Sequence, residues 1–240
     1  RNVMNDWFQF KRFIVKQDRC AMKVGTDGVL LGAWAQGSRR ILDIGTGTGL
    51  IALMMAQRFP DAVVDAVEID GEAANQAKDN AVCSPFHTRV NVFETSLQDY
   101  AKDFEGQPYD AIVSNPPYFN NSLKNPDGRR TIARHTDSLP YAVLFRSVDK
   151  LLAANGAFSL IVPNDIKADI LTEAAVFGFF LLRETAVKTT SSKQPKRCLF
   201  AFTKVRPESV NKETVTMMNA DATPSSWYSN LTEDFYLSKE

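Results

Sequence analysis

One stretch decides the fold: Ile41-Leu42-Asp43-Ile44-Gly45-Thr46-Gly47-Thr48-Gly49-Leu50. An apolar strand pattern runs into a loop of alternating glycines and then into a helical pattern. A ligand can approach the backbone closely only where Cβ atoms are absent, and glycine also adopts the positive φ angles of a tight turn. In doubly wound α/β folds such a crevice lies at the carboxyl ends of the strands, where ligands bind. The stretch therefore predicts an α/β domain with a ligand site at this loop.

The spacing of the glycines excludes one ligand and favours another. The dinucleotide fingerprint GxGxxG needs its third glycine at position 50, where Leu50 stands, and no Tyr/Lys or Cys/His pair of an oxidoreductase is evident. What remains is DxGxGxG, which resembles the S-adenosylmethionine loop of the Rossmann-like methyltransferases. A carboxylate two residues before the first glycine can take an ammonium group or a network of water. The resemblance implies a cofactor site made by Asp43, Gly45, Thr46 and Gly47.

Outside the loop, short β-branched runs alternate with helical patterns, which is typical of a mostly parallel, doubly wound sheet. Seven strands are expected, at residues 40–44, 63–69, 90–93, 109–114, 157–162, 181–188 and 197–204. Helices are expected at residues 50–58, 71–82, 141–153 and 165–177. The last two strands are joined by a segment too short for a crossover helix, so they should pair antiparallel. Such a sheet also resembles the seven-stranded methyltransferase fold.

The length of 240 residues suits one α/β domain with small additions. We assign residues 39–205 to that domain, and residues 1–38 and 206–240 to extensions. In the first extension we expect a short strand around residues 8–15 and a helix that Thr26 caps. In the second we expect a strand at residues 210–218 and a helix at residues 227–237.

Composition excludes several classes of protein. Lys and Arg number 28 and balance 28 Asp and Glu, so contact with nucleic acid must come from a local patch. No apolar run approaches the roughly 20 residues of a membrane span, and no secretion signal is evident. The three cysteines and two histidines are scattered without the spacing of metal ligands. We expect a cytoplasmic protein with no metal and no membrane contact.

Glu68 closes the second expected strand, at the place where an acidic residue binds ribose hydroxyls in doubly wound folds. Its two carboxylate oxygens can accept from two hydroxyls at once. We therefore add Glu68 and the following Ile69 to the candidate cofactor site. The alternative interpretation is that Glu68 and Asp70 are solvated charges at a strand end.

The tetrad Asn115-Pro116-Pro117-Tyr118 directly follows the fourth expected strand. Neither proline has an N–H and both fix φ, so the turn is stiff and the Pro116 carbonyl stays available as an acceptor. An amine conjugated to a ring gains positive charge as it attacks a sulfonium methyl. Asn115 Oδ1 and the Pro116 carbonyl can stabilise that charge as preorganised dipoles, and Tyr118 can hold an extruded base. The alternative is a plain rigid turn.

The tetrad resembles the NPPY motif of amino-methyltransferases that act on adenine N6, guanine N2 or a glutamine amide. Residues 10–13, 22–34 and 228–237 are together similar to the bacterial tRNA1(Val) (adenine-37-N6)-methyltransferase family. This resemblance covers nearly the whole chain. It implies a Rossmann-like seven-stranded sheet, S-adenosylmethionine as cofactor, and N6 of adenine 37 in a valine-accepting tRNA as the methyl acceptor.

The resemblance also implies further site residues. The segment before the first strand lies over the cofactor in that family, which makes Lys23 and Thr26 candidate cofactor neighbours. Many such enzymes carry an acidic residue after the third strand, and this chain offers Ser96 and Leu97 there, with Asp99 one turn later. Asn115 is counted with the cofactor residues as well as with the catalytic ones.

RNA contacts are expected from cations near the mouth of the site. Two clusters lie at or beyond strand ends: Arg129, Arg130 and Arg134, and Lys193, Lys196 and Arg197. Phosphate contacts of this kind give orientation and salt-dependent affinity. For any one of these residues, the alternative is a solvated charge.

Other functions stay open at this point. A protein glutamine methyltransferase should carry a recognition domain before the catalytic one, and only about 38 residues precede the first expected strand. A cofactor-binding scaffold without turnover should have a damaged tetrad, yet all four residues are present. A methyltransferase of another RNA is compatible with every motif. We expect no obligate protein partner.

Overall fold

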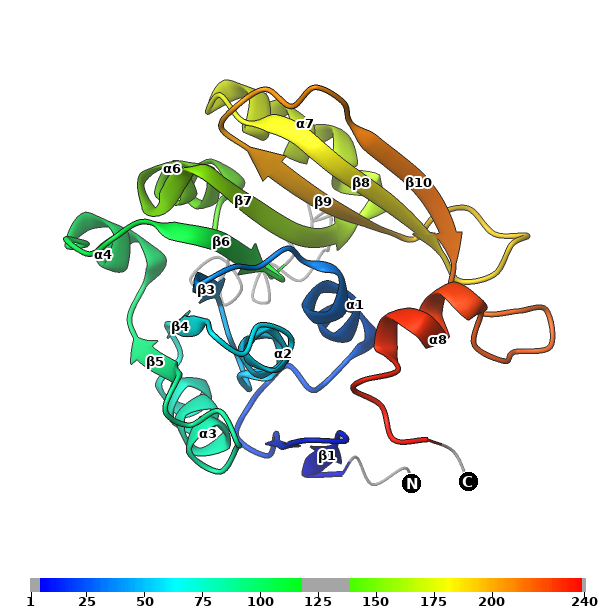
Figure 1. Ribbon diagram of the computed structural model, residues 1–240, viewed down its shortest axis with the longest axis horizontal. Coiled ribbons are helices and arrows are strands. Elements are labelled where there is room, and N and C mark those ends of the chain that lie inside the picture. The colour runs from blue at the N-terminus through cyan, green and yellow to red at the C-terminus, as the bar shows by residue number, and fades with distance from the viewer. Residues whose placement is uncertain (1–4, 118–138, 239–240) are drawn as a thin grey trace, which may run out of the picture.

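The computed structural model describes residues 5–117 and 139–238 (Figure 1). A central sheet contains the strands β3 (Arg40–Ile44), β4 (Val63–Glu68), β5 (Val90–Glu94), β6 (Tyr109–Ser114), β7 (Leu152–Pro163), β8 (Phe180–Lys188), β9 (Arg197–Thr203) and β10 (Asn211–Thr216). The helices are α1 (Thr26–Trp34), α2 (Leu50–Arg58), α3 (Gly71–Val82), α4 (Leu97–Lys102), α6 (Tyr141–Leu151), α7 (Lys167–Val176) and α8 (Ser226–Thr232), with a 3₁₀ turn η1 (Asn164–Ile166).

The strand order is β10-β8-β9-β7-β6-β3-β4-β5. Every neighbouring pair is parallel except the two pairs that β9 makes, with β7 and with β8. The expected seven strands and the antiparallel last pair are confirmed. The sheet gains an eighth strand, β10, which lies parallel to β8 at the edge.

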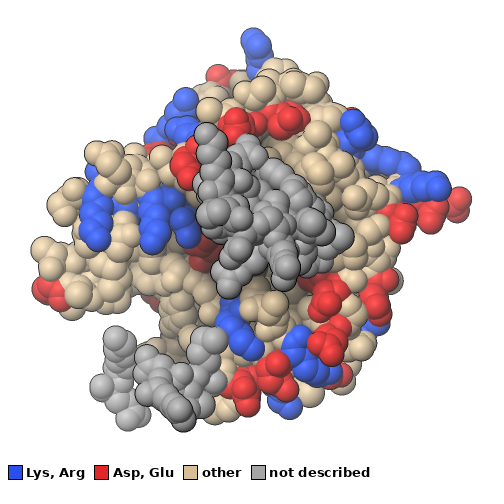
Figure 2. Space-filling view, turned by 180° about the vertical axis from the view of Figure 1, so that it is seen from behind, with Lys and Arg blue, Asp and Glu red and all other residues tan. Residues whose placement is uncertain are grey.

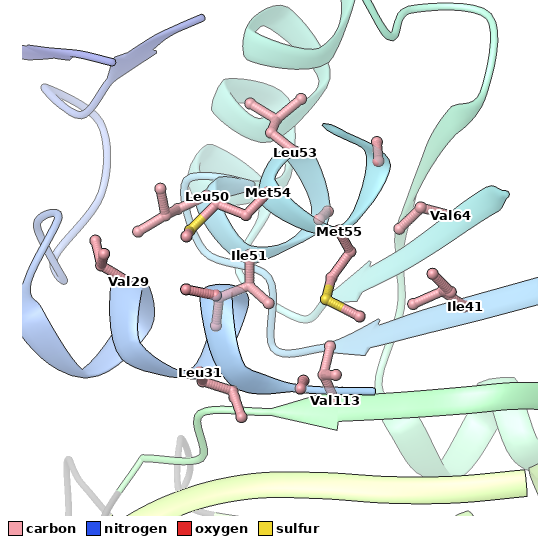
Figure 3. Packing of buried hydrophobic residues seen from close by; sticks show 14 of the residues in the cluster. Val29, Leu31, Ile41, Leu50, Ile51, Leu53, Met54, Met55, Val64 and Val113 are labelled. Carbon is pink, nitrogen blue, oxygen red and sulfur yellow. The ribbon is translucent and has the colours of Figure 1, made fainter. Parts of the chain in front are cut away.

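Two apolar layers cover the two faces of the sheet, and helices lie over both faces (Figure 1). Successive side chains of a strand point to opposite faces, so Ile41 packs in one layer and Leu42 in the other. Helices α1, α2 and α3 cover the first face, and α4, α6 and α7 cover the second. Figure 3 shows Met55 of α2 pointing toward the sheet, where Ile41 and Val113 lie.

Helix α1 lies unusually close to α2. A Cβ on Gly32 would stand 2.5 Å from the Met54 sulfur, so a larger residue there would force the two helices apart. This close packing fixes the start of α1 next to the loop that precedes α2. The amino end of α1 therefore lies at the carboxyl edge of the sheet.

Three local predictions were wrong in detail. Residues 8–15 form two strands, β1 (Trp7–Gln9) and β2 (Ile14–Lys16), because the backbone N–H of Phe10 bonds to the Phe13 carbonyl and turns the chain. Thr26 does not cap α1: it is the first helical residue, and the N-cap is Gly25 without a side-chain bond. The terminal helix α8 stops at Thr232, after which Phe235 turns back into the core.

The described residues contain neither a membrane-spanning helix nor a metal-binding cluster. Within residues 5–117 and 139–238, no helix has the length and apolarity needed to cross a membrane. The same residues contain no group of three or more His, Cys, Asp or Glu side chains placed to hold a metal ion.

Candidate functional site

The glycine loop between β3 and α2 folds back onto the end of β4. The backbone N–H groups of Gly45 and Thr46 both donate to the Val67 carbonyl, at 2.9 and 3.1 Å. Gly47 has a φ of 54°, in the left-handed region that favours glycine, and no atom lies within 4 Å of the position its Cβ would take. The loop thus presents bare backbone to open space.

Glu68 is fixed at the end of β4 by backbone groups. Its Oε1 accepts from the Gly47 N–H at 2.8 Å, and its Oε2 accepts from the Asp70 N–H at 3.0 Å. A carboxylate has about four lone-pair sites, so each oxygen keeps capacity for another donor. Ile69 follows with an exposed side chain. Glu68 therefore holds the loop against the end of β4 and keeps unused lone pairs.

Asp43 lies under the loop and is completely buried. Its Oδ2 accepts from the Thr46 hydroxyl at 2.7 Å, while its Oδ1 has no hydrogen-bond partner among the described residues. Burial raises the pKa of the Asp43 carboxyl to about 7, against the opposing effect of the Thr46 hydrogen bond. An unpartnered buried carboxyl oxygen is a group that a cation or an ordered water would satisfy.

A pocket of about 540 Å³ opens above the loop. Of the residues proposed from the sequence for the cofactor, it gathers Lys23, Thr26, Gly45, Thr46, Gly47 and Asn115. The others do not line this pocket: Asp43, Glu68, Ile69, Ser96 and Leu97. The lining comes from segments far apart in the chain, including the start of α1 and the connection between β8 and β9.

Ser96 and Leu97 have structural roles in α4, a helix that the sequence analysis did not predict. Ser96 is the N-cap of α4, and its hydroxyl accepts from the Asp99 N–H at 3.1 Å. Leu97 is buried in the core of the second face. The Ser-x-x-Asp spacing was the signal that could have indicated this helix start.

The sequence analysis missed the side-chain amides that hold the N-terminal segment against the loop. Asn80 of α3 donates to the carbonyl oxygens of Thr48, at 2.8 Å, and Lys16, at 2.9 Å. One turn earlier, Gln76 accepts from the Arg19 N–H at 2.8 Å. Both amides are buried, and their four-residue spacing on one helix face is the signal that could have found them.

Asn115 stands at the junction of β6 and the pocket. The Ser114 hydroxyl donates to the Ile44 carbonyl at 3.4 Å, which joins the end of β6 to the end of β3. Asn115 is partly buried and lines the pocket, Pro116 is buried, and Pro117 is exposed. Tyr118 lies outside the described residues. Asn115 thus borders the same space as the glycine loop.

Of the two predicted RNA-binding clusters, only the second lies within the described residues. Arg129, Arg130 and Arg134 lie outside the described residues. Lys193 is exposed on the connection between β8 and β9, Lys196 is exposed and lines the pocket, and Arg197 begins β9. Figure 2 shows Lys and Arg side chains gathered at the left of the molecule, on the side where this connection lies.

Known proteins resemble this chain in sequence. The methyltransferase small domain family matches residues 23–169. A protein of Bacteroides thetaiotaomicron named tRNA1(Val) (adenine(37)-N6)-methyltransferase is 47% identical over 238 residues, covering 98% of this chain and 99% of that protein.

Solved structures share the fold. A predicted O-methyltransferase from Agrobacterium tumefaciens has a TM-score of 0.67 at 20% identity, covering 87% of this chain and 96% of that one. The glycopeptide N-methyltransferase MtfA, solved with S-adenosylmethionine, has a TM-score of 0.54 at 12% identity, covering 77% of this chain and 100% of the other. At these identities the likeness concerns the fold alone.

Proposed function

The chain belongs to the tRNA1(Val) (adenine(37)-N6)-methyltransferase family, and from that premise we propose how its residues methylate N6 of adenine 37 in a valine-accepting tRNA. S-adenosylmethionine is the cofactor. The observation that carries the proposal is the position of Asn115, which faces the same pocket as the glycine loop. A donor held at the loop and an amine held at Asn115 would therefore lie next to each other.

The residues present fit this cofactor. At Gly45 and Gly47 the loop has no Cβ atom to block a close approach, and Glu68 keeps lone pairs for two ribose hydroxyls. The unpartnered Oδ1 of Asp43 has the capacity to accept from an ammonium group, directly or through water. When bound, S-adenosylmethionine supplies a methyl group already activated as a sulfonium. We assign Lys23, Thr26 and Ile69 as further cofactor neighbours, and Ser96 and Leu97 as positions near its adenine.

Asn115 and Pro116 do the chemical work on the acceptor amine. Their oxygens accept hydrogen bonds from the two N6 hydrogens and stabilise the positive charge that develops on nitrogen as it attacks, and the methylated amine then releases one proton to water. Pro116 and Pro117 hold the turn stiff because both fix φ. The aromatic ring of Tyr118 is assigned to hold the extruded base. Positioning then supplies much of the rate, since no covalent intermediate with the enzyme is needed.

The remaining assignments concern the surroundings of the site. Residues 39–205 form the methyltransferase domain, residues 1–38 an extension over the cofactor, and residues 206–240 an extension packed on the same domain. The two clusters of cations hold the phosphates of the tRNA. The enzyme acts in the cytoplasm, where its substrate is found, and without an obligate protein partner.

The test is methyl transfer from labelled S-adenosylmethionine to unmodified valine tRNA, followed by nucleoside analysis. The matched control is the same tRNA with adenine 37 replaced by guanine. N6-methyladenosine that is formed only with adenine 37 supports the proposal. Label that persists in the replaced tRNA would point to another position in the tRNA, and no label in any tRNA would move the acceptor to another RNA or to a glutamine amide.

A further inference from the structure

Asn115 directly follows β6, which lies inside the sheet with strands on both sides. On one side lie β3 and β4, which carry the glycine loop and Glu68. On the other side lie β7, β9, β8 and β10. Since the first side is taken by the methyl donor, the acceptor must enter from the second.

The pocket has a wall on that second side, made by Val187, Thr189, Lys196 and Met217. We call these four residues the acceptor wall. Its backbone is locked in place: the Lys196 N–H donates to the Val187 carbonyl at 2.9 Å, and the Lys196 carbonyl accepts from the Asn164 N–H at 3.0 Å. The Met217 N–H donates to the Lys188 carbonyl at 2.9 Å. The wall is therefore a preformed surface.

An ion pair ties the acceptor wall to the start of α1. Arg197 Nε donates to Asp27 Oδ2 at 2.7 Å, and both residues line the pocket. The same guanidinium also donates from Nη1 to the Lys196 carbonyl at 3.2 Å. Arg197 thus holds Lys196 from one side and α1 from the other. The Lys196 ammonium is the next cation along the pocket.

The chemistry of the wall matches one part of an RNA strand. Met217 is half-buried and supplies apolar surface, Thr189 supplies a hydroxyl, and Lys196 supplies a cation, whereas the Val187 side chain is almost wholly buried and contributes mainly its backbone. A ribose with its phosphate needs all three, whereas a glutamine amide has no anionic group for the lysine. We propose that the acceptor wall receives the ribose and phosphate of the nucleotide to be methylated. Lys196 contacts the phosphate, and the Asp27–Arg197 ion pair holds Lys196 in position. This inference rests on the proposed function and deepens it.

The test compares Lys196→Ala with Lys212→Ala in the intact enzyme. Lys212 is also an exposed lysine and lies near the start of β10. Because β10 runs parallel to β8, this start lies at the amino ends of the parallel strands, away from the pocket at their carboxyl ends. For Lys196→Ala we expect a KM for valine tRNA about tenfold higher, and a salt dependence of tRNA binding whose log–log slope is smaller by about 1. The Kd for S-adenosylmethionine should stay unchanged. Lys212→Ala should leave all three quantities unchanged.

The positioning role of the Asp27–Arg197 ion pair is tested by Arg197→Gln and Arg197→Lys. Arg197→Gln should raise the KM for tRNA with little change in kcat, because the wall shifts while Asn115 stays in place. Arg197→Lys keeps a cation opposite Asp27 and should restore most of the affinity. Thermal unfolding of each variant shows whether the fold is intact. A Kd for S-adenosylmethionine equal to that of the wild type shows that the cofactor site is intact as well.

Two failures can be told apart. If the wild-type enzyme methylates adenine 37 but Lys196→Ala matches Lys212→Ala in KM and in salt slope, the acceptor wall is overturned and the proposed function stands. If the wild-type enzyme leaves adenine 37 unmethylated, the proposed function fails and the wall assignment fails with it.

Discussion

The cofactor side and the acceptor wall meet at Asn115 but are held by different kinds of contact. The cofactor side is local: residues 43–70 supply the loop, Glu68 and Asp43, and several of the bonds that shape it involve backbone groups. The acceptor wall joins residues 187–197 to Met217, and a side-chain ion pair fixes it to Asp27. We infer that local backbone bonds shape the cofactor side and that long-range contacts shape the surface that selects the acceptor.

The largest difference between the two sides should appear in their response to pH. The unfolded Asp43 carboxyl loses its proton near the ordinary pKa of 3.8, and the folded one near 7. Between these values the folded state holds more protons, so its stability falls as pH rises, by about 4 kcal/mol in all, and levels off above about 7.

Denaturant unfolding of the cofactor-free protein at pH 5 and pH 8 measures this effect against Asp43→Asn. The variant has no carboxyl at this position, so the wild type should lose stability relative to it across that interval. The contribution would be disproved by parallel pH profiles of the two proteins.

On the acceptor side, a single hydroxyl joins three elements. Thr185 of β8 accepts from the Trp34 indole N–H at 3.1 Å and donates to Glu213 of β10 at 2.8 Å. Thr185→Val removes both bonds and leaves the buried indole N–H unpaired, so the free energy of unfolding should fall by about 1–3 kcal/mol. The melting temperature should drop by about 2–4 °C for each kcal/mol.

The matched control for this change is Thr172→Val on the exposed face of α7. It should leave the melting temperature nearly constant, and neither variant should alter the Kd for S-adenosylmethionine. A weaker cofactor affinity in Thr185→Val would mean that the two sides are not held independently.

The smallest expected effect concerns Glu68. Glu68→Gln keeps an oxygen for the Gly47 N–H but removes the charge, and hydrogen bonds to charged groups are about twice as strong as neutral ones. We expect the Kd for S-adenosylmethionine to rise about threefold to tenfold, measured by calorimetry. Asp70→Asn is the control, because Asp70 caps α3 and asparagine caps equally well. Equal losses in the two variants would remove the special role of Glu68.

The same contrast explains what could be predicted from the sequence. The strand Arg40–Ile44 and the helices Leu50–Arg58 and Gly71–Val82 have the expected bounds, because periodicity and a glycine loop are local signals. The eighth strand pairs with β8 across a long stretch of chain, and no local pattern indicates such a partner. Burial of Asp43 under its own loop also follows from tertiary packing.

The candidate site divides in the same way. Asn115 and the glycines were found from motifs that are contiguous in the sequence, and the pocket brings them together. Asn80, Val187, Thr189 and Met217 carry no motif, and only the fold places them near the loop. Arg197 was predicted as an RNA contact from its charge and its place at a strand end, while its bond to Asp27 joins residues 170 positions apart in the chain.

The central claim is that a methyl donor on one side and an adenine on the other meet at Asn115. It is tested most directly by single-turnover methylation of valine tRNA by Asn115→Ala, with both substrates saturating. Loss of one hydrogen bond to a developing charge, worth about 1.5–3 kcal/mol, should slow the rate about 10- to 100-fold, while the Kd for tRNA changes by less than about threefold. A rate equal to that of the wild type would contradict the account.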